Sequence, residues 1–227
     1  MIEILNVTKS YKSNEILKDV SFTIGDGETV GIVGYNGSGK SVLLKLITGL
    51  TKPDQGTIQV DGKMIEKDVD FIQDAGVFIN SPSFMSYMSG YDNLAILAEI
   101  RKKIGEKEIL DVLEQVHLSG AKDKKVKSYS QGMIQRLRIA QAIMEDPKYL
   151  IMDEPMNALD EEGHEVVAEI LKNSKEKGRT ILFTAHDRGD VYNFSDYVLK
   201  IGDKKVRKMT LEELMKETEK KSQYYAR

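Results

Sequence analysis

A glycine-rich segment, GYNGSGKS at residues 34–41, has the residue types and the spacing that hold phosphate groups. It fits the pattern G-x-x-x-x-G-K-S, in which glycines let backbone N–H groups approach phosphate oxygens without a β-carbon in the way. The Lys40 ammonium can reach the β- and γ-phosphates of a nucleotide, and the Ser41 hydroxyl can ligate Mg²⁺. The predicted nucleotide contacts in this phosphate loop are Gly34, Asn36, Gly37, Ser38, Gly39, Lys40, Ser41 and Val42.

The surroundings of the phosphate loop support this interpretation. An apolar run at residues 30–33 predicts a buried strand before the loop, and residues 42–47 predict a helix after it, ended by Gly49. A helix that begins at the loop adds a partial positive charge where the phosphates would bind. The alternative is an ordinary glycine-rich turn, and the strand–loop–helix context argues against it.

A second candidate for chemistry is the stretch YLIMDEP at residues 149–155, where four apolar residues are followed by Asp153 and Glu154. Carboxylates at the C-terminal end of a buried parallel strand lie beside the crevice where α/β sheets bind ligands. Asp153 is predicted to hold Mg²⁺, and Glu154 is predicted to take a proton from an attacking water. The alternative is a strand that ends in a solvated acidic turn, which the phosphate loop in the same chain disfavours.

The composition is that of an ordinary globular protein, with 227 residues of which 41% are apolar and 30% charged. The formal net charge of −3 gives no support to a general nucleic-acid-binding surface. Because there is no cysteine, there is neither a disulfide framework nor a thiolate metal site. No apolar run approaches the roughly 18 residues that span a bilayer, and the first residues do not form a signal peptide. We therefore expect a cytoplasmic protein that reaches a membrane only through another chain.

Strand-like and helix-like segments alternate along the chain, which predicts an α/β fold. The N-terminal part is predicted to be antiparallel, with a two-residue hairpin turn at Asp61-Gly62. Amphipathic spacing predicts helices around residues 109–116 and 166–171, and Thr210 with Glu213 predicts a capping box for a last helix. The other predicted features are buried parallel strands at residues 149–152 and 180–184 and a polar loop at residues 122–130.

The segment between the two candidate motifs resembles the signature region of the ATP-binding-cassette (ABC) family. The stretch SYSQGMIQRLRIAQAIMEDPKYLIMDEP at residues 128–155 carries YSQGM, residues 129–133, where the family has L-S-G-G-Q. The resemblance covers nearly the whole chain. It implies one ABC ATP-binding domain over residues 1–227: a P-loop NTPase core with a mostly parallel sheet, a small antiparallel β subdomain on the N-terminal side, and an inserted helical subdomain at about residues 82–145.

The resemblance also implies roles for individual residues. Tyr11 matches the aromatic residue that stacks on adenine, and His186, in ILFTAHD, matches the switch histidine at the γ-phosphate. Ser130 and Gly132 would contact the γ-phosphate held by a second cassette, so that two chains enclose two ATP molecules head to tail. Asp160, in NALD, belongs to the loop that crosses to the partner subunit. The implied cofactors are ATP and Mg²⁺; the implied metal ligands are Ser41, Asn80 and Asp153, and the implied catalytic residues are Glu154 and His186.

The detailed pattern is similar to the cassettes of bacterial peptide-antibiotic exporters of the bacitracin type. The segments that carry this similarity are GVFINSPSF at 76–84, GYDNL at 90–94 and YSQGM at 129–133. This similarity implies an ATPase subunit that powers export through a separate membrane permease, whose cytosolic helix would dock near residues 84–91. The cassettes would pair as a homodimer or as two different chains. Two other classes stay open: a soluble ABC ATPase acting in translation or repair, and an assembly factor such as the cassette of iron–sulfur assembly.

The chain departs from the family pattern at Asn80 and within the signature. Asn80 stands where most cassettes carry glutamine, and its shorter side chain must lie closer to Mg²⁺ to serve as a ligand. Gln131 and Met133 replace a glycine and a glutamine of the signature, and a methionine side chain donates no hydrogen bond. Because Glu154 and His186 are intact, we expect a working ATPase.

Overall fold

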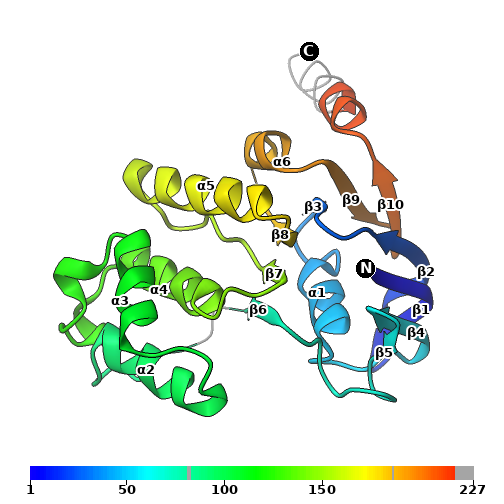
Figure 1. Ribbon diagram of the computed structural model, residues 1–227. Helices are drawn as coiled ribbons and strands as arrows, with labels where there is room; N and C mark the ends of the chain where they lie inside the picture. Colours follow the sequence, from blue (N-terminus) through cyan, green and yellow to red (C-terminus); the bar gives the residue numbers. More distant parts are fainter. Residues whose placement is uncertain (81–82, 186, 218–227) are drawn as a thin grey trace. The chain divides into compact units, whose positions relative to one another are not determined.

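A computed structural model describes residues 1–80, 83–185 and 187–217, shown as a ribbon in Figure 1. The chain divides into two compact units, and each is described by itself. The first unit comprises residues 1–72 and the chain from residue 182 onward, and the second comprises residues 73–181. In the described residues, no helix is both long and apolar enough to cross a membrane.

The first unit contains a four-stranded antiparallel sheet with the strand order β2-β1-β4-β5. The alternating burial of β1, with Ile2 and Ile4 fully buried, is what one covered face of such a sheet requires. Asp61 and Gly62 both have positive φ, 50° and 75°, as the predicted two-residue hairpin turn needs. The strands of this sheet are β1 (Ile2–Tyr11), β2 (Asn14–Ile24), β4 (Gln55–Val60) and β5 (Lys63–Met64).

The first unit also contributes part of a larger, mostly parallel sheet. Strand β3 (Thr29–Val33) is fully buried and pairs in parallel with β9 (Tyr197–Gly202), which pairs antiparallel with β10 (Lys205–Met209). Near-continuous apolar sequence is typical of a strand covered on both faces, and β3 was predicted on that basis. The buried strand β8 (Thr180–Thr184) carries the chain from the second unit back to the first. The helices of the first unit are α1 (Lys40–Thr48), α6 (Arg188–Phe194) and a last helical segment at residues 211–217.

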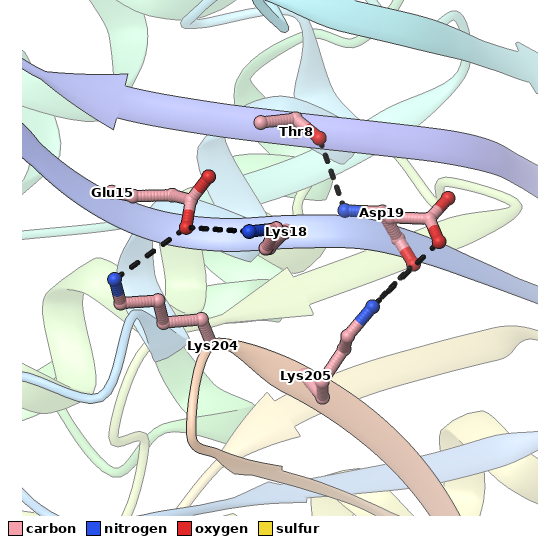
Figure 2. Close-up of polar contacts among 6 residues, drawn as sticks. All are labelled: Thr8, Glu15, Lys18, Asp19, Lys204 and Lys205. Atoms are coloured by element: carbon pink, nitrogen blue, oxygen red, sulfur yellow. Dashed lines mark hydrogen bonds and ion pairs between the residues drawn. The ribbon is translucent and has the colours of Figure 1, made fainter.

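Polar contacts join the turn between β9 and β10 to strand β2 (Figure 2). The Lys18 backbone N–H donates to the Lys204 carbonyl at 2.8 Å, and Lys204 Nζ lies 3.4 Å from Glu15 Oε2. Lys205 Nζ lies 3.7 Å from Asp19 Oδ2. Exposed ion pairs of this kind contribute little to stability, so the backbone hydrogen bond is the firmer connection. It holds β2, which runs beside the phosphate loop, to the larger sheet.

The second unit is mainly helical, and it holds one parallel strand pair. Strand β6 (Ala75–Phe78) pairs with β7 (Tyr149–Met152). Gly76 is required where β6 meets α4, because a β-carbon there would lie 1.7 Å from the carbonyl oxygen of Ala142. The helices are α2 (Gly90–Arg101), α3 (Glu106–Gln115), α4 (Gln131–Ile143) and α5 (Glu161–Glu176), with short 3-10 turns at Ser119–Ala121 and Val126–Ser128.

The sequence-based expectations for fold class are confirmed. The protein has the α/β character, the mostly parallel sheet and the antiparallel sheet on the N-terminal side that the sequence predicts. Thr210 and Glu213 form the predicted capping box, with the Thr210 N–H donating to Glu213 Oε2 and the Glu213 N–H donating to Thr210 Oγ1. The predicted polar loop at residues 122–130 is interrupted by one 3-10 turn at Val126–Ser128.

Candidate functional site

The phosphate loop joins β3 to α1, as predicted. The helix begins at Lys40, one residue after Gly39, whose φ of 106° lies in the left-handed region that favours glycine. Lys40 is buried, with 7% of its surface exposed, and its ammonium donates to the carbonyls of Gly34 at 3.0 Å and Tyr35 at 3.4 Å. The lysine therefore lies folded over its own loop, at the end of the helix where anions are attracted.

Glycine is needed in the phosphate loop for reasons of space as well as backbone conformation. A β-carbon on Gly34 would lie 2.4 Å from Ser38 Oγ and 2.7 Å from the Ile201 carbonyl oxygen. A β-carbon on Gly39 would lie 2.8 Å from Ile16 Cγ2. Ile16, on β2, is not among the predicted site residues, because an isolated isoleucine in a strand gives no sequence signal that it packs against the phosphate loop.

The loop residues fit a phosphate group. Ser38 Oγ is buried, and the structure gives it no hydrogen-bond partner among the described residues. A buried hydroxyl without a partner costs about 1–3 kcal/mol, which a phosphate oxygen would relieve. The first turn of α1 has no side-chain cap, so its backbone N–H groups are also available to an anion. Ser41 and Val42 stand in that first turn.

Tyr11 ends strand β1 in the first unit with 45% of its surface exposed. Its hydroxyl lies 3.4 Å from Thr51 Oγ1, and the Lys9 ammonium lies 5.2 Å from the ring centroid. Lys9 is itself held by an ion pair with Asp54 at 3.0 Å. The ring is thus oriented by its neighbours while much of it stays accessible, which suits stacking on a flat base.

The signature segment, residues 129–133, leads into α4 in the second unit. Ser130 is the N-cap of α4, and its hydroxyl accepts a hydrogen bond from the Met133 N–H at 3.2 Å. The segment is fixed from behind by Tyr129, which is 7% exposed and donates to the Ala121 carbonyl at 2.7 Å. Burial raises the pKa of the Tyr129 hydroxyl, so it remains a donor at neutral pH. Ser130 is exposed at the start of the helix, where N–H groups attract anions.

Asp153 and Glu154 follow β7, and Asn80 follows the neighbouring parallel strand β6. Phe78 pairs with Met152, so Asn80 and Glu154 each lie two residues beyond a matched pair at the same edge of the sheet. Asn80 is exposed and has a φ of 56°, a left-handed conformation that asparagine tolerates better than most residues. This backbone requirement is a physical reason for asparagine at position 80 that the sequence pattern did not reveal.

The chain turns sharply at residues 153–157, called the catalytic turn below. Glu154 has a φ of 56°, rare for a residue other than glycine. Its carbonyl accepts from the Asn157 N–H at 3.2 Å, and its Oε2 accepts from Asn157 Nδ2 at 3.1 Å. Gln135 Nε2 donates to the Glu154 carbonyl at 2.9 Å and to the Pro155 carbonyl at 3.1 Å. Sequence reasoning had assigned no role to Gln135.

Asp160 and His186 are the remaining predicted nucleotide-site residues. Asp160 is the N-cap of α5, and its carboxylate accepts from the Gly163 N–H at 2.9 Å. His186 lies outside the described residues. The three predicted metal ligands fall in different units, with Ser41 in the first and Asn80 and Asp153 in the second. Among residues 1–80, 83–185 and 187–217, no group of three or more histidine and acidic side chains could alone hold a metal ion.

Comparison with known proteins gives consistent matches. A family model described as "ABC transporter" matches residues 17–157. YybJ of Bacillus subtilis, described as an uncharacterized ABC transporter ATP-binding protein, is 39% identical over 88% of this chain and 92% of its own length. The lantibiotic transport ATP-binding protein SrtF of Streptococcus pyogenes is 34% identical over 87% of this chain and 85% of its own. The bacitracin transport ATP-binding protein BcrA of Enterococcus faecalis is 34% identical over 87% of this chain, but the match spans 65% of BcrA.

Solved structures agree with these matches. The ATP-binding cassette MJ0796, in a dimeric post-hydrolysis state bound to ADP and Pi, superposes with a TM-score of 0.83 and 27% identity. The superposition covers 93% of this chain and 99% of that one. A second dimeric structure of MJ0796, described as a bacterial ABC transporter cassette, gives a TM-score of 0.82 with 29% identity over the same shares of the two chains.

Proposed function

This chain belongs to the ABC transporter family as an ATP-binding, ATP-hydrolysing subunit, and from that premise we propose that it powers export through a separate membrane permease. The exported compounds are peptides or antibiotic-like molecules. The observation that carries this proposal is the 34% identity to SrtF and BcrA, whose names give lantibiotic and bacitracin transport. The whole chain acts as one ATP-binding domain, with its helical subdomain at about residues 82–145.

Within this proposal the predicted residues have the following roles. Gly34 and residues 36–42 hold the phosphates of ATP, and Tyr11 stacks on its adenine. Glu154 takes a proton from the attacking water, and His186 donates a hydrogen bond to the γ-phosphate. Ser130 and Gly132, with Asp160 in the crossing loop, act on the ATP bound by a second cassette. The support is the orphaned Ser38 hydroxyl, the exposed cap at Ser130 and the dimeric state of MJ0796.

Mg²⁺ would be held by Ser41, Asp153 and Asn80, together with phosphate oxygens. Hydroxyl, carboxylate and amide oxygens are the ligands that Mg²⁺ prefers, and it usually takes only one or two carboxylates from the protein. When bound, Mg²⁺ neutralises charge on the phosphates and orients them.

Replacing Asn80 by glycine tests its part in metal binding. Glycine adopts the left-handed backbone of residue 80 freely, so the fold should be kept while the amide oxygen is lost. We expect the Mg²⁺ concentration for half-maximal ATPase activity to rise about tenfold. Asn6→Gly, at another left-handed asparagine with a φ of 51°, is the matched control and should not shift it. An unchanged Mg²⁺ requirement in folded Asn80→Gly would remove Asn80 from the metal site.

Copurification tests whether the chain forms a complex with a membrane permease. The cytosolic helix of the permease is expected to dock near residues 84–91, where Met85 and Tyr87 are 42% and 68% exposed. The permease would hold two cassettes at an effective concentration of about the millimolar range. Coexpression with a neighbouring membrane-protein gene should therefore yield a complex whose specific ATPase activity exceeds that of the isolated chain. Recovery of ribosomes or a soluble scaffold instead of a multi-span protein would favour the non-transport alternatives.

A further inference from the structure

Gln135 is buried in the second unit, with 5% of its surface exposed, and its side-chain amide makes three hydrogen bonds. Its Nε2 donates to the carbonyls of Glu154 and Pro155, at 2.9 and 3.1 Å. Its Oε1 accepts from Arg138 Nη1 at 3.0 Å. A buried glutamine that reaches residues 19 and 20 positions away in the sequence is fixed by tertiary structure, since helix geometry alone would not place it there.

The partners of Gln135 leave only one orientation for its amide. The two backbone carbonyls can only accept hydrogen bonds, so they need the NH₂ group, and a guanidinium can only donate, so it needs the amide oxygen. Rotating the amide by 180° would break all three bonds at once. Burial lowers the pKa of Arg138, but its guanidinium keeps the proton at physiological pH and continues to donate.

The two carbonyls that Gln135 binds belong to Glu154 itself and to the residue after it, within the turn that carries the Glu154 side chain. The left-handed backbone at Glu154 costs energy for a residue with a β-carbon and persists only where its surroundings enforce it. Pro155 fixes its own φ and restricts the residue before it. Holding two successive carbonyls fixes the peptide planes on both sides of Pro155. Without these bonds the turn could relax toward a common backbone conformation and redirect the carboxylate.

Gln135 stands on the same helix as the signature segment. The Ser130 N-cap and Gln135 are five residues apart on α4, about 7.5 Å along the helix axis. The first turn of α4 also lies next to Ala158, the residue that follows the catalytic turn, since a β-carbon on Gly132 would lie 3.4 Å from the Ala158 carbonyl oxygen. The helix whose tip serves the ATP of a partner chain is therefore attached directly to the segment that carries Glu154.

We propose that Gln135 is a positioning residue that holds the catalytic turn of its own chain onto the signature helix, so that the Glu154 carboxylate is correctly placed for hydrolysis. This inference rests on the proposed function, in which Glu154 is the base and Ser130 serves the partner's ATP. In a dimer, Gln135 then connects the part of a chain that senses one ATP to the part that hydrolyses the other.

Gln135→Glu is the discriminating substitution. It keeps the size of the side chain and an oxygen for Arg138, but it removes both N–H donors and puts an oxygen next to the two carbonyls. We expect kcat to fall roughly 10- to 100-fold, because a small misplacement of a catalytic group has effects of this size. The affinity for ATP, measured by equilibrium binding, should stay the same. Gln135→Met should behave likewise, and Gln141→Met is the matched control on the same helix, expected to keep the wild-type kcat.

Mixed dimers distinguish positioning of Glu154 from support of the signature. One chain carries Ser130→Arg and supplies Glu154, and the other carries Lys40→Ala and supplies the signature. The mixture with Gln135→Glu on the Glu154-supplying chain should hydrolyse ATP about tenfold more slowly than the mixture with it on the other chain. Equal rates, a slower rate in the reverse arrangement, or a wild-type kcat for Gln135→Glu would overturn the inference. If wild-type protein itself lacks ATPase activity, the proposed function fails instead.

Discussion

Glu154→Gln should bind ATP as well as the wild type and lose nearly all hydrolysis. The general base contributes on the order of 10²- to 10⁴-fold to such a rate, and an uncharged amide cannot take the proton of the attacking water. Glutamine has the same size and can keep an oxygen for Asn157 Nδ2, which lies 3.1 Å from Glu154 Oε2. The substitution therefore removes the proton acceptor and keeps the size of the side chain and its contact with Asn157. Single-turnover hydrolysis and equilibrium ATP binding, measured on the same preparation, separate the two effects.

In the proposed mechanism hydrolysis weakens the dimer that encloses ATP, so Glu154→Gln should also accumulate a dimer in the presence of ATP. Size-exclusion chromatography with and without ATP reports this directly. Glu165→Gln, at an exposed position on α5, is the matched control and should hydrolyse ATP at the wild-type rate. Hydrolysis by Glu154→Gln within about twofold of wild type would remove this carboxylate from the mechanism.

Ser130→Arg should abolish the activity of the assembled pair while each chain still binds ATP at its own phosphate loop. Ser130 is exposed at the N-terminus of α4, so an arginine there is not expected to disturb the core. Its bulk would collide with the γ-phosphate presented by the partner chain. The substitution also removes a helix cap, which costs about 1 kcal/mol. Ser130→Ala loses the same cap without the bulk, so a much larger loss of rate for Ser130→Arg isolates the steric effect.

Much of this architecture could be predicted because its causes are local in sequence. Apolar runs predicted β7 and β8 at residues 149–152 and 180–184, and Gly49 ends α1 with a φ of 82°, as its position predicted. The phosphate loop was recognisable because glycine spacing, a preceding strand and a following helix all occur within about twenty residues. In such segments each residue's conformation depends mainly on its neighbours along the chain.

The features that sequence reasoning missed depend on contacts between distant residues. Gln135 looked like an ordinary residue of the signature helix, and its two carbonyl partners could be found only from the tertiary structure. Ile16 is adjacent to Gly39 only after β2 and the phosphate loop have folded together. The sequence at Asn80 shows only a side chain shorter than glutamine. The left-handed backbone at residue 80, which favours asparagine, is visible only in the structure.

The departure of the signature at Met133 also has a local explanation. The cap of α4 uses the backbone N–H of Met133, which any residue except proline supplies. Replacing the usual glutamine therefore does not remove the bond that starts the helix. This supports the expectation that the variant signature, with Ser130 and Gly132 kept, remains competent.

In the proposed dimer each working ATP site takes its phosphate loop and Glu154 from one chain and Ser130 from another. Mixing Ser130→Arg chains with Lys40→Ala chains tests it most directly, because either variant alone has no complete site. A mixed pair regains one site, with the phosphate loop of the first chain and the signature of the second. At equal amounts the mixture should recover about a quarter of the wild-type ATPase rate, because half the pairs are mixed and each has one working site. Full activity of either variant alone, or no recovery where differently tagged chains prove that mixed pairs have formed, would contradict the account.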